Sequence, residues 1–123
     1  MRQISVAYWH DGNIVSLYYI FPLTKKDKTK IIIEAEIYPG EGWAAKRQKV
    51  RAEFHNVQYI NKKIDFNEVV DNIGAGTIDR VTQKEIIRAN RKFQEYRFRL
   101  FGNSRSRTNM IRIVSNKVKI TQL

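Results

Sequence analysis

The sequence predicts an α+β protein from three observations. The first half contains β-branched and alternating runs, the middle contains two capping-box motifs ahead of apolar stripes, and the C-terminal end returns to alternation with period two. We expect an antiparallel β-meander of about four strands, then two short helices and a C-terminal β-unit. An open barrel similar to the oligonucleotide-binding fold is one arrangement compatible with this order. A chain of 123 residues, 42% hydrophobic and 28% charged, fits a single domain over residues 1–123.

Four strands are expected in the first half of the chain. Ile4–Trp9 and Ile14–Phe21 flank Asp11-Gly12, a strong hairpin signal. Residues 31–38 alternate glutamate with apolar side chains, as a half-buried strand requires. Residues 49–59 alternate in the same way, and a bulge near Asn56 would account for the change of phase before Tyr59.

Two helices are expected next. Asp65 and Glu68 have capping-box spacing ahead of one apolar face, and Gly74 is placed to end that helix. Thr82 and Glu85 repeat the spacing ahead of a second helix that reaches residue 93.

A small β-unit is expected to complete the chain. Tyr96–Leu100 alternates with arginine and favours a strand, although the second helix could also continue to Phe101. Residues 102–109 form a polar basic loop, and Met110–Val114 and Lys117–Thr121 form a closing hairpin around Ser115-Asn116.

The charge is segregated along the chain. The formal net charge is +11; residues 1–45 carry five basic and five acidic side chains, whereas residues 80–123 carry twelve basic and two acidic ones. A contiguous positive field favours a polyanionic partner, and a nucleic acid is the leading one. The sequence contains no cysteine, which suits a reducing cytoplasm. The apolar run Ile4–Trp9 is too short for a signal peptide, and Leu17–Leu23, broken by Pro22, is too short to span a bilayer. We therefore expect a cytoplasmic protein without a membrane partner.

The candidate nucleic-acid contacts come from four segments. The second expected helix places its cations opposite its apolar stripe, the strand after it exposes arginines, and the loop at 102–109 offers two guanidinium groups beside small polar residues. A compact cluster at 46–51 could also touch a phosphate backbone. The candidate binding residues are Lys84, Arg88, Arg91, Lys92, Arg97, Arg99, Arg105, Arg107, Lys46, Arg47, Lys49 and Arg51.

Aromatic residues near the cluster at 46–51 have two interpretations. Tyr38, Trp43 and Tyr59 could stack on unpaired bases, or they could pack in the core, which is the commoner role. Trp9 and Tyr18 lie in the neutral first hairpin and are expected to pack.

No catalytic residue, metal ligand or cofactor is predicted. His10 and His55 lack the spacing of a metal site, and Gly74-Ala75-Gly76 lacks the lysine of a phosphate-binding loop. Asp65, Glu68 and Asp71, together with Glu34 or Glu36, could hold Mg²⁺ in a nuclease, but capping already explains the first two.

Three functions remain open, in descending order. The first is non-enzymatic binding of DNA or RNA, mainly through phosphate contacts. The second is an interaction or inhibitory subunit, for example of a phage or mobile-element assembly, that docks its basic face on an acidic protein. The third is the metal-dependent nuclease. The sequence does not determine the oligomeric state.

Overall fold

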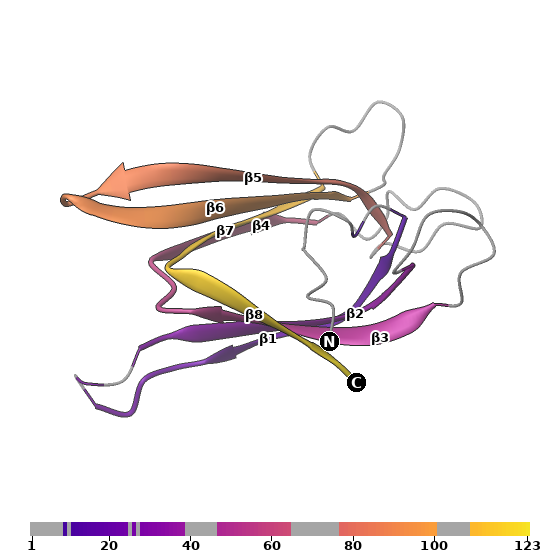
Figure 1. Cartoon of the computed structure of the whole chain (residues 1–123), viewed down its shortest axis with the longest axis horizontal. Helices are drawn as coiled ribbons and strands as arrows, with labels where there is room; N and C mark the ends of the chain where they lie inside the picture. Colours follow the sequence, from indigo (N-terminus) through magenta and orange to yellow (C-terminus); the bar gives the residue numbers. More distant parts are fainter. Residues whose placement is uncertain are drawn as a thin grey trace.

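The computed structural model describes residues 9, 11–24, 26, 28–38, 47–64, 77–100 and 109–123. Every regular element in these residues is a strand, and the eight strands form two antiparallel sheets (Figure 1). One sheet has the order β1-β2-β3-β8 and the other β4-β7-β6-β5. The strands are β1 (Asn13–Ile20), β2 (Lys30–Ile37), β3 (Gln48–His55), β4 (Tyr59–Lys63), β5 (Ile78–Arg88), β6 (Arg91–Leu100), β7 (Met110–Ser115) and β8 (Lys117–Gln122).

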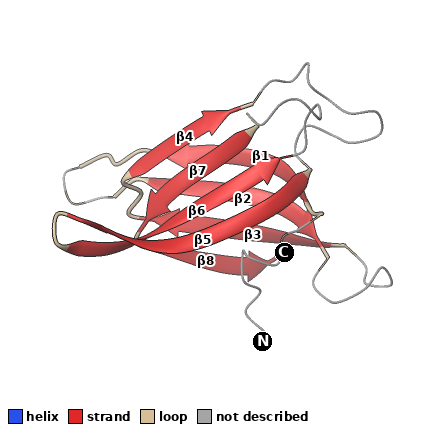
Figure 2. Ribbon diagram, turned by 90° about the horizontal axis from the view of Figure 1, so that it is seen from above, coloured by secondary structure: helices blue, strands red, loops and turns tan. Residues whose placement is uncertain are grey.

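The two sheets lie face to face and their strands cross (Figure 2). Alternation along each strand sends apolar side chains inward, as a two-layer β protein requires. Phe54 of β3 contacts Tyr96 of β6 edge-on, with ring centroids 5.1 Å apart, and Trp9 lies 6.1 Å from Phe98. One core cluster therefore includes side chains of both sheets.

At one corner of the molecule the chain passes between the sheets twice. β3 gives way to β4 at Asn56, which has a left-handed φ of 51°, and β7 gives way to β8 at Asn116. The Asn116 amide donates to the His55 carbonyl (3.0 Å), and the Gln58 amide donates to the Val114 carbonyl (2.8 Å). The two crossing segments thus remain hydrogen-bonded to each other as they bend.

The start of β1 meets the start of β5 at a second junction between the sheets. Asn13 pairs with Thr77, and backbone hydrogen bonds join Asp11 and Gly12 to Ile78 (2.9 and 2.8 Å). A Cβ at Gly12 would lie 2.9 Å from the Glu36 carbonyl oxygen, so only glycine allows this close approach of the backbone. The sheets are therefore joined at two places.

The structure contradicts the α+β prediction: the described residues contain no helix, and their eight strands form two antiparallel four-stranded sheets. The second expected helix is instead the β5–β6 hairpin, whose turn residues Ala89 and Asn90 both have left-handed φ values (49° and 61°). This is the geometry of a two-residue type I′ turn, which usually carries Asn-Gly. Without that signal the capping-box spacing of Thr82 and Glu85 resembled a helix start. The first expected helix, from Asp65 to Gly74, lies outside the described residues.

Several strands were predicted correctly, and β1, β2 and β3 pair antiparallel in chain order as the expected meander requires, but later pairings were predicted wrongly. Predicted strands 14–21, 31–38 and 96–100 correspond to β1, β2 and the end of β6. The expected single strand at 49–59 is divided between the two sheets at Asn56, so no bulge is needed. The expected hairpin at 110–121 is also wrong, because β7 and β8 belong to different sheets. Ile4–Trp9 lies outside the described residues except for Trp9, which is buried; Tyr18, expected to pack, is 38% exposed.

No helix among the residues described is long and apolar enough to cross a bilayer.

The turn at Ala89 gives a first prediction. A left-handed conformation costs an alanine about 1 to 2 kcal/mol, and glycine removes this cost but gives the unfolded chain more conformational entropy, which lowers stability by about 0.4 to 1 kcal/mol. Ala89→Gly should therefore raise the free energy of unfolding by about 0.5 to 1 kcal/mol, measured by urea denaturation. A lower free energy of unfolding in this variant would contradict the type I′ turn.

His55 lies at the first corner and gives a second prediction. Its Nε2 is buried and has no hydrogen-bond partner in the described part of the chain. Burial, and then nearby lysines, lower the pKa of His55 below its ordinary value of 6.5, and Glu53 partly offsets this. The lysines are Lys30, Lys117 and Lys119.

Because the folded pKa of His55 is below the unfolded one, the unfolded chain binds more protons once the pH falls to about 6.5 and below. Acidification from about pH 7.5 to about pH 5 should therefore lower the free energy of unfolding. His55→Gln should remove the part of this pH dependence that comes from protonation of His55. The variant should therefore lose less of its free energy of unfolding over that pH range than the natural chain does. Parallel stability curves for the two proteins would show that His55 does not contribute.

Candidate nucleic-acid interface

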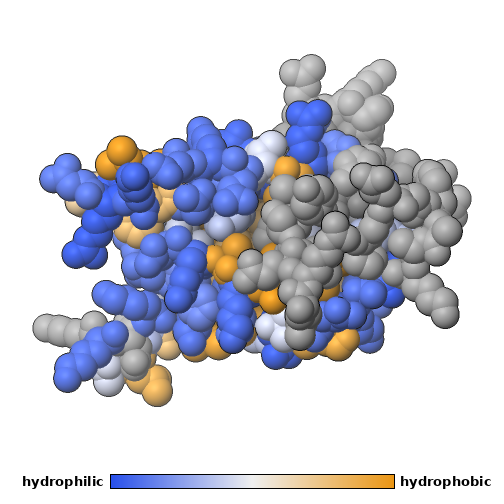
Figure 3. Space-filling model, in the orientation of Figure 1, coloured by the Kyte–Doolittle hydropathy of each residue, from blue (hydrophilic) through white to orange (hydrophobic). Residues whose placement is uncertain are grey.

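The outward side of the sheet β4-β7-β6-β5 carries eight of the eighteen lysine and arginine residues that the structure describes. The inward residues Tyr96 and Phe98 are buried, so the alternation turns Arg97 and Arg99 outward, and the register places side chains of the neighbouring strands beside them. Hydrophilic side chains predominate around β5 and β6 at the upper left of Figure 3, where the sheets are seen from the side. We call this surface the arginine face; its cations are Lys63, Arg80, Lys84, Arg88, Arg91, Arg97, Arg99 and Arg112.

Arginines face each other directly across three pairs of strand positions. Arg80 is opposite Arg99, Arg88 is opposite Arg91, and Arg97 is opposite Arg112. Side chains in such positions have Cβ atoms only about 4.5 to 5.5 Å apart, and like charges there are destabilising. The arginine face therefore concentrates positive charge at a cost in stability.

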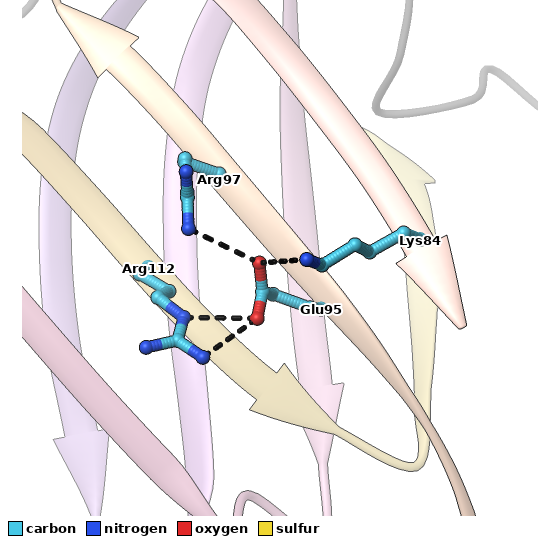
Figure 4. A network of polar contacts seen from close by, with 4 residues as sticks. All are labelled: Lys84, Glu95, Arg97 and Arg112. Atoms are coloured by element: carbon cyan, nitrogen blue, oxygen red, sulfur yellow. Dashed lines mark hydrogen bonds and ion pairs between the residues drawn. The ribbon is translucent and has the colours of Figure 1, made fainter. Parts of the chain in front are cut away.

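One buried carboxylate holds three of these cations (Figure 4). The side chain of Glu95 accepts hydrogen bonds from Arg112 Nη2 (2.7 Å) and Nε (2.9 Å) and from Arg97 Nη2 (3.4 Å), and Lys84 Nζ lies 3.8 Å from it. Glu95 is only 3% exposed. It offsets the repulsion between Arg97 and Arg112 and fixes the Arg112 guanidinium, but one negative charge leaves the group of three cations net positive.

The other cations of the arginine face have fewer partners. Arg99 Nε lies 3.6 Å from Asp79 Oδ2. Arg80, Arg88 and Arg91 are exposed and make no ion pair with any residue that the structure describes. Their guanidinium groups are therefore available to an external anion.

The structure brings five of the twelve candidate residues together on this face: Lys84, Arg88, Arg91, Arg97 and Arg99. Lys92 does not belong to it. Its cross-strand partner is Ile87, which places it on the opposite side of the hairpin, and its Nζ lies 3.9 Å from Glu85. Candidates Lys46, Arg105 and Arg107 lie outside the described residues.

The candidates at 47–51 belong to the other sheet. Arg51 makes an ion pair with Glu34 (3.1 Å), and Arg47 lies 3.8 Å from Glu36 and above the Tyr38 ring. Lys49 is exposed and faces Glu36 across the strands. This cluster is therefore separate from the arginine face and is largely compensated by carboxylates of the same sheet.

Three members of the arginine face were missed by sequence reasoning: Lys63, Arg80 and Arg112. Arg112 alternates with Ile111 and Ile113, so its outward direction was available from the sequence. Its neighbours were not, because they depend on β7 pairing with β6 instead of with β8.

The described residues offer little support for a metal site. They contain no group of three histidine or carboxylate side chains placed to hold an ion. Glu34 is paired with an arginine, as described above, and Asp65, Glu68, Asp71 and His10 lie outside the described residues.

Comparison of the sequence with protein-family models and with curated proteins gives no match.

The arginine pairs give a third prediction. Arg80→Thr should raise the free energy of unfolding by about 0.2 to 1 kcal/mol at low salt, because it removes the repulsion with Arg99. The gain should shrink at high salt as the repulsion is screened. Urea denaturation at two salt concentrations measures both effects.

Lys49→Thr is the matched control, because Lys49 lies in the sheet β1-β2-β3-β8 and is directly opposite Glu36 on the neighbouring strand. It should lower the free energy of unfolding by a similar amount, and the loss should also shrink at high salt. If both variants change the free energy of unfolding in the same direction, the sign of the charge across the strands does not determine the effect, and the prediction is wrong.

Proposed function

We propose that this protein is a non-enzymatic nucleic-acid-binding protein that contacts phosphates through its arginine face. The observation that carries the proposal is the set of three arginine pairs placed directly across neighbouring strands. Glu95 offsets the repulsion between Arg97 and Arg112, but no carboxylate bridges Arg80 and Arg99 or Arg88 and Arg91 in the described part of the chain. A phosphate lying between the guanidinium groups of those two pairs would convert the repulsion into attraction.

The kind of cation also supports the proposal. Six of the eight cations on the arginine face are arginines. A guanidinium group presents a planar array of donors that suits bidentate contact with phosphate, whereas a lysine acts as a point charge. Neighbouring strands are about 4.8 Å apart, so the face offers several such donors within reach of successive phosphates.

Protection of the sheet edge does not account for the whole face. Charged side chains on an edge strand discourage pairing with another chain, and this can explain Arg80 and Arg88 on β5. It does not explain Arg97 opposite Arg112, because these residues lie on the two inner strands of the sheet. A role in binding accounts for both sets.

As part of this proposal we place the protein in the cytoplasm. The chain contains no cysteine and so needs no oxidising environment for disulfide bonds, and nucleic acid is present in the cytoplasm.

The proposal predicts a strong dependence of binding on salt. If about five phosphates are neutralised, the logarithm of the association constant should fall with the logarithm of salt concentration at a slope of about −4 to −5 on duplex DNA. On single strands the slope should be about −3 to −4. Fluorescence anisotropy with labelled duplex DNA, single-stranded DNA and RNA of about 20 nucleotides gives both the affinity and the slope.

The arginine face is tested by the triple variant Arg80→Gln, Arg88→Gln, Arg91→Gln. It should bind more weakly, and the slope should become shallower by about 1 for each phosphate that the variant no longer neutralises. The matched control, Lys49→Gln, Lys117→Gln, Lys119→Gln, removes the same charge from the other sheet and should change affinity much less. A salt-independent affinity, or an equal weakening in both variants, would contradict the proposal.

A further inference from the structure

A groove of about 270 Å³ lies beside the arginine face. It is formed where the end of β1 and the start of β2 approach the segment that joins β3 to β4. Its walls are mainly apolar and include three aromatic side chains, Tyr19, Phe21 and Tyr59, with Val57 between the sheets and Thr29 and Gln58 as polar neighbours.

The aromatic side chains of the groove are unusually exposed for their type. Phe21 is 71% exposed and Tyr59 is 40% exposed. The rings of Tyr19 and Phe21 are neighbours on the same side of β1, with centroids 6.0 Å apart, and only Tyr19 packs against the core. Packing in the core therefore does not explain Phe21 or the exposed part of Tyr59.

A cation accompanies two of the three rings. Lys62 Nζ lies 5.1 Å from the centroid of the Tyr19 ring, and the Arg112 guanidinium carbon lies 5.4 Å from that of Tyr59. Arg112 is also a member of the arginine face, where Glu95 fixes it. Tyr59 thus lines the groove and also contacts a member of the arginine face.

We infer that this groove receives an unpaired nucleobase of a single strand whose phosphates lie on the arginine face. The inference rests on the proposed function and specifies the form of nucleic acid. Aromatic rings beside cations are the usual means by which proteins hold single strands, because each base can stack on a ring while its phosphate meets the charge. The groove is smaller than the roughly 300 to 1,000 Å³ of sites for drug-sized ligands, which suits one flat group.

A duplex cannot use the groove in this way, since its bases are stacked and paired inside the helix. The protein should accordingly prefer single-stranded DNA or RNA to a duplex of the same length. An apolar side chain of a protein partner could also enter the groove, but it would not need the phosphate surface that adjoins it.

The test compares strands that share phosphates and differ in bases. Oligothymidine, oligouridine and an abasic DNA strand of equal length would be bound to the natural chain and to Phe21→Ala and Tyr59→Leu. Each substitution should weaken binding of both base-containing strands by about 5- to 150-fold, the range for removal of one stacked base, and leave the abasic strand unchanged. Phe21→Ala is the cleaner variant, because it leaves the contact between Tyr59 and Arg112 intact.

Leu23→Ala is the control, since Leu23 is 95% exposed on the same segment but does not line the groove. It should bind all three strands as the natural chain does. If the natural chain binds abasic and base-containing strands equally, the groove is not a base site although the arginine face still binds phosphate. If none of the strands is bound, the proposed function itself fails, and the inference fails with it.

Discussion

Two crossing segments, bound to each other by backbone hydrogen bonds, determine how the rest of this molecule is arranged. Asn116 donates to the carbonyl of His55, and Gln58 donates to that of Val114, so the bend between β3 and β4 and the bend between β7 and β8 occur together. This shared bend puts β7 next to β6 in one sheet and β8 next to β3 in the other. The contact of Arg112 with Glu95, and therefore the centre of the arginine face, follows from that placement.

The sequence predicted the residues of the arginine face better than it predicted the structure that presents them. A helical wheel places Lys84, Arg88 and Arg91 on one face, and so does the β5–β6 hairpin, because β5 alternates and the two-residue turn keeps Arg91 opposite Arg88. The helix and the hairpin differ in where they place Lys92. On a helix it lies on the same face as Arg88 and Arg91, whereas on a strand it points to the side opposite Arg91, so it was wrongly included. This is the error expected when the period is misjudged; Arg80, which precedes the expected helix, was missed.

The remaining errors concern pairing and could not be corrected from local sequence. Ser115-Asn116 between two alternating runs has the pattern of a hairpin, and the sequence near Asn56 has the pattern of a bulge. Both are bends at which the chain changes sheet, and the hydrogen bonds that distinguish the cases join residues about 60 positions apart. Local propensity contains no information about such contacts. The strand positions themselves were recoverable because alternation is a local property.

The two sheets of the protein can be compared for the side chains that lie opposite their lysines and arginines. Both outer faces are rich in lysine and arginine, and both have the same strand geometry. On the sheet β1-β2-β3-β8 three cations face carboxylates: Arg51 is opposite Glu34, Lys49 is opposite Glu36, and Lys119 is opposite Glu53. Lys117 is opposite His55 and Lys30 is opposite Ile20. On the sheet β4-β7-β6-β5 Lys84 is opposite Glu95, but arginine faces arginine in three places. A chain that was basic only for solubility would have no reason to differ between its two sheets in this way, and the proposed contact with phosphates would account for the difference.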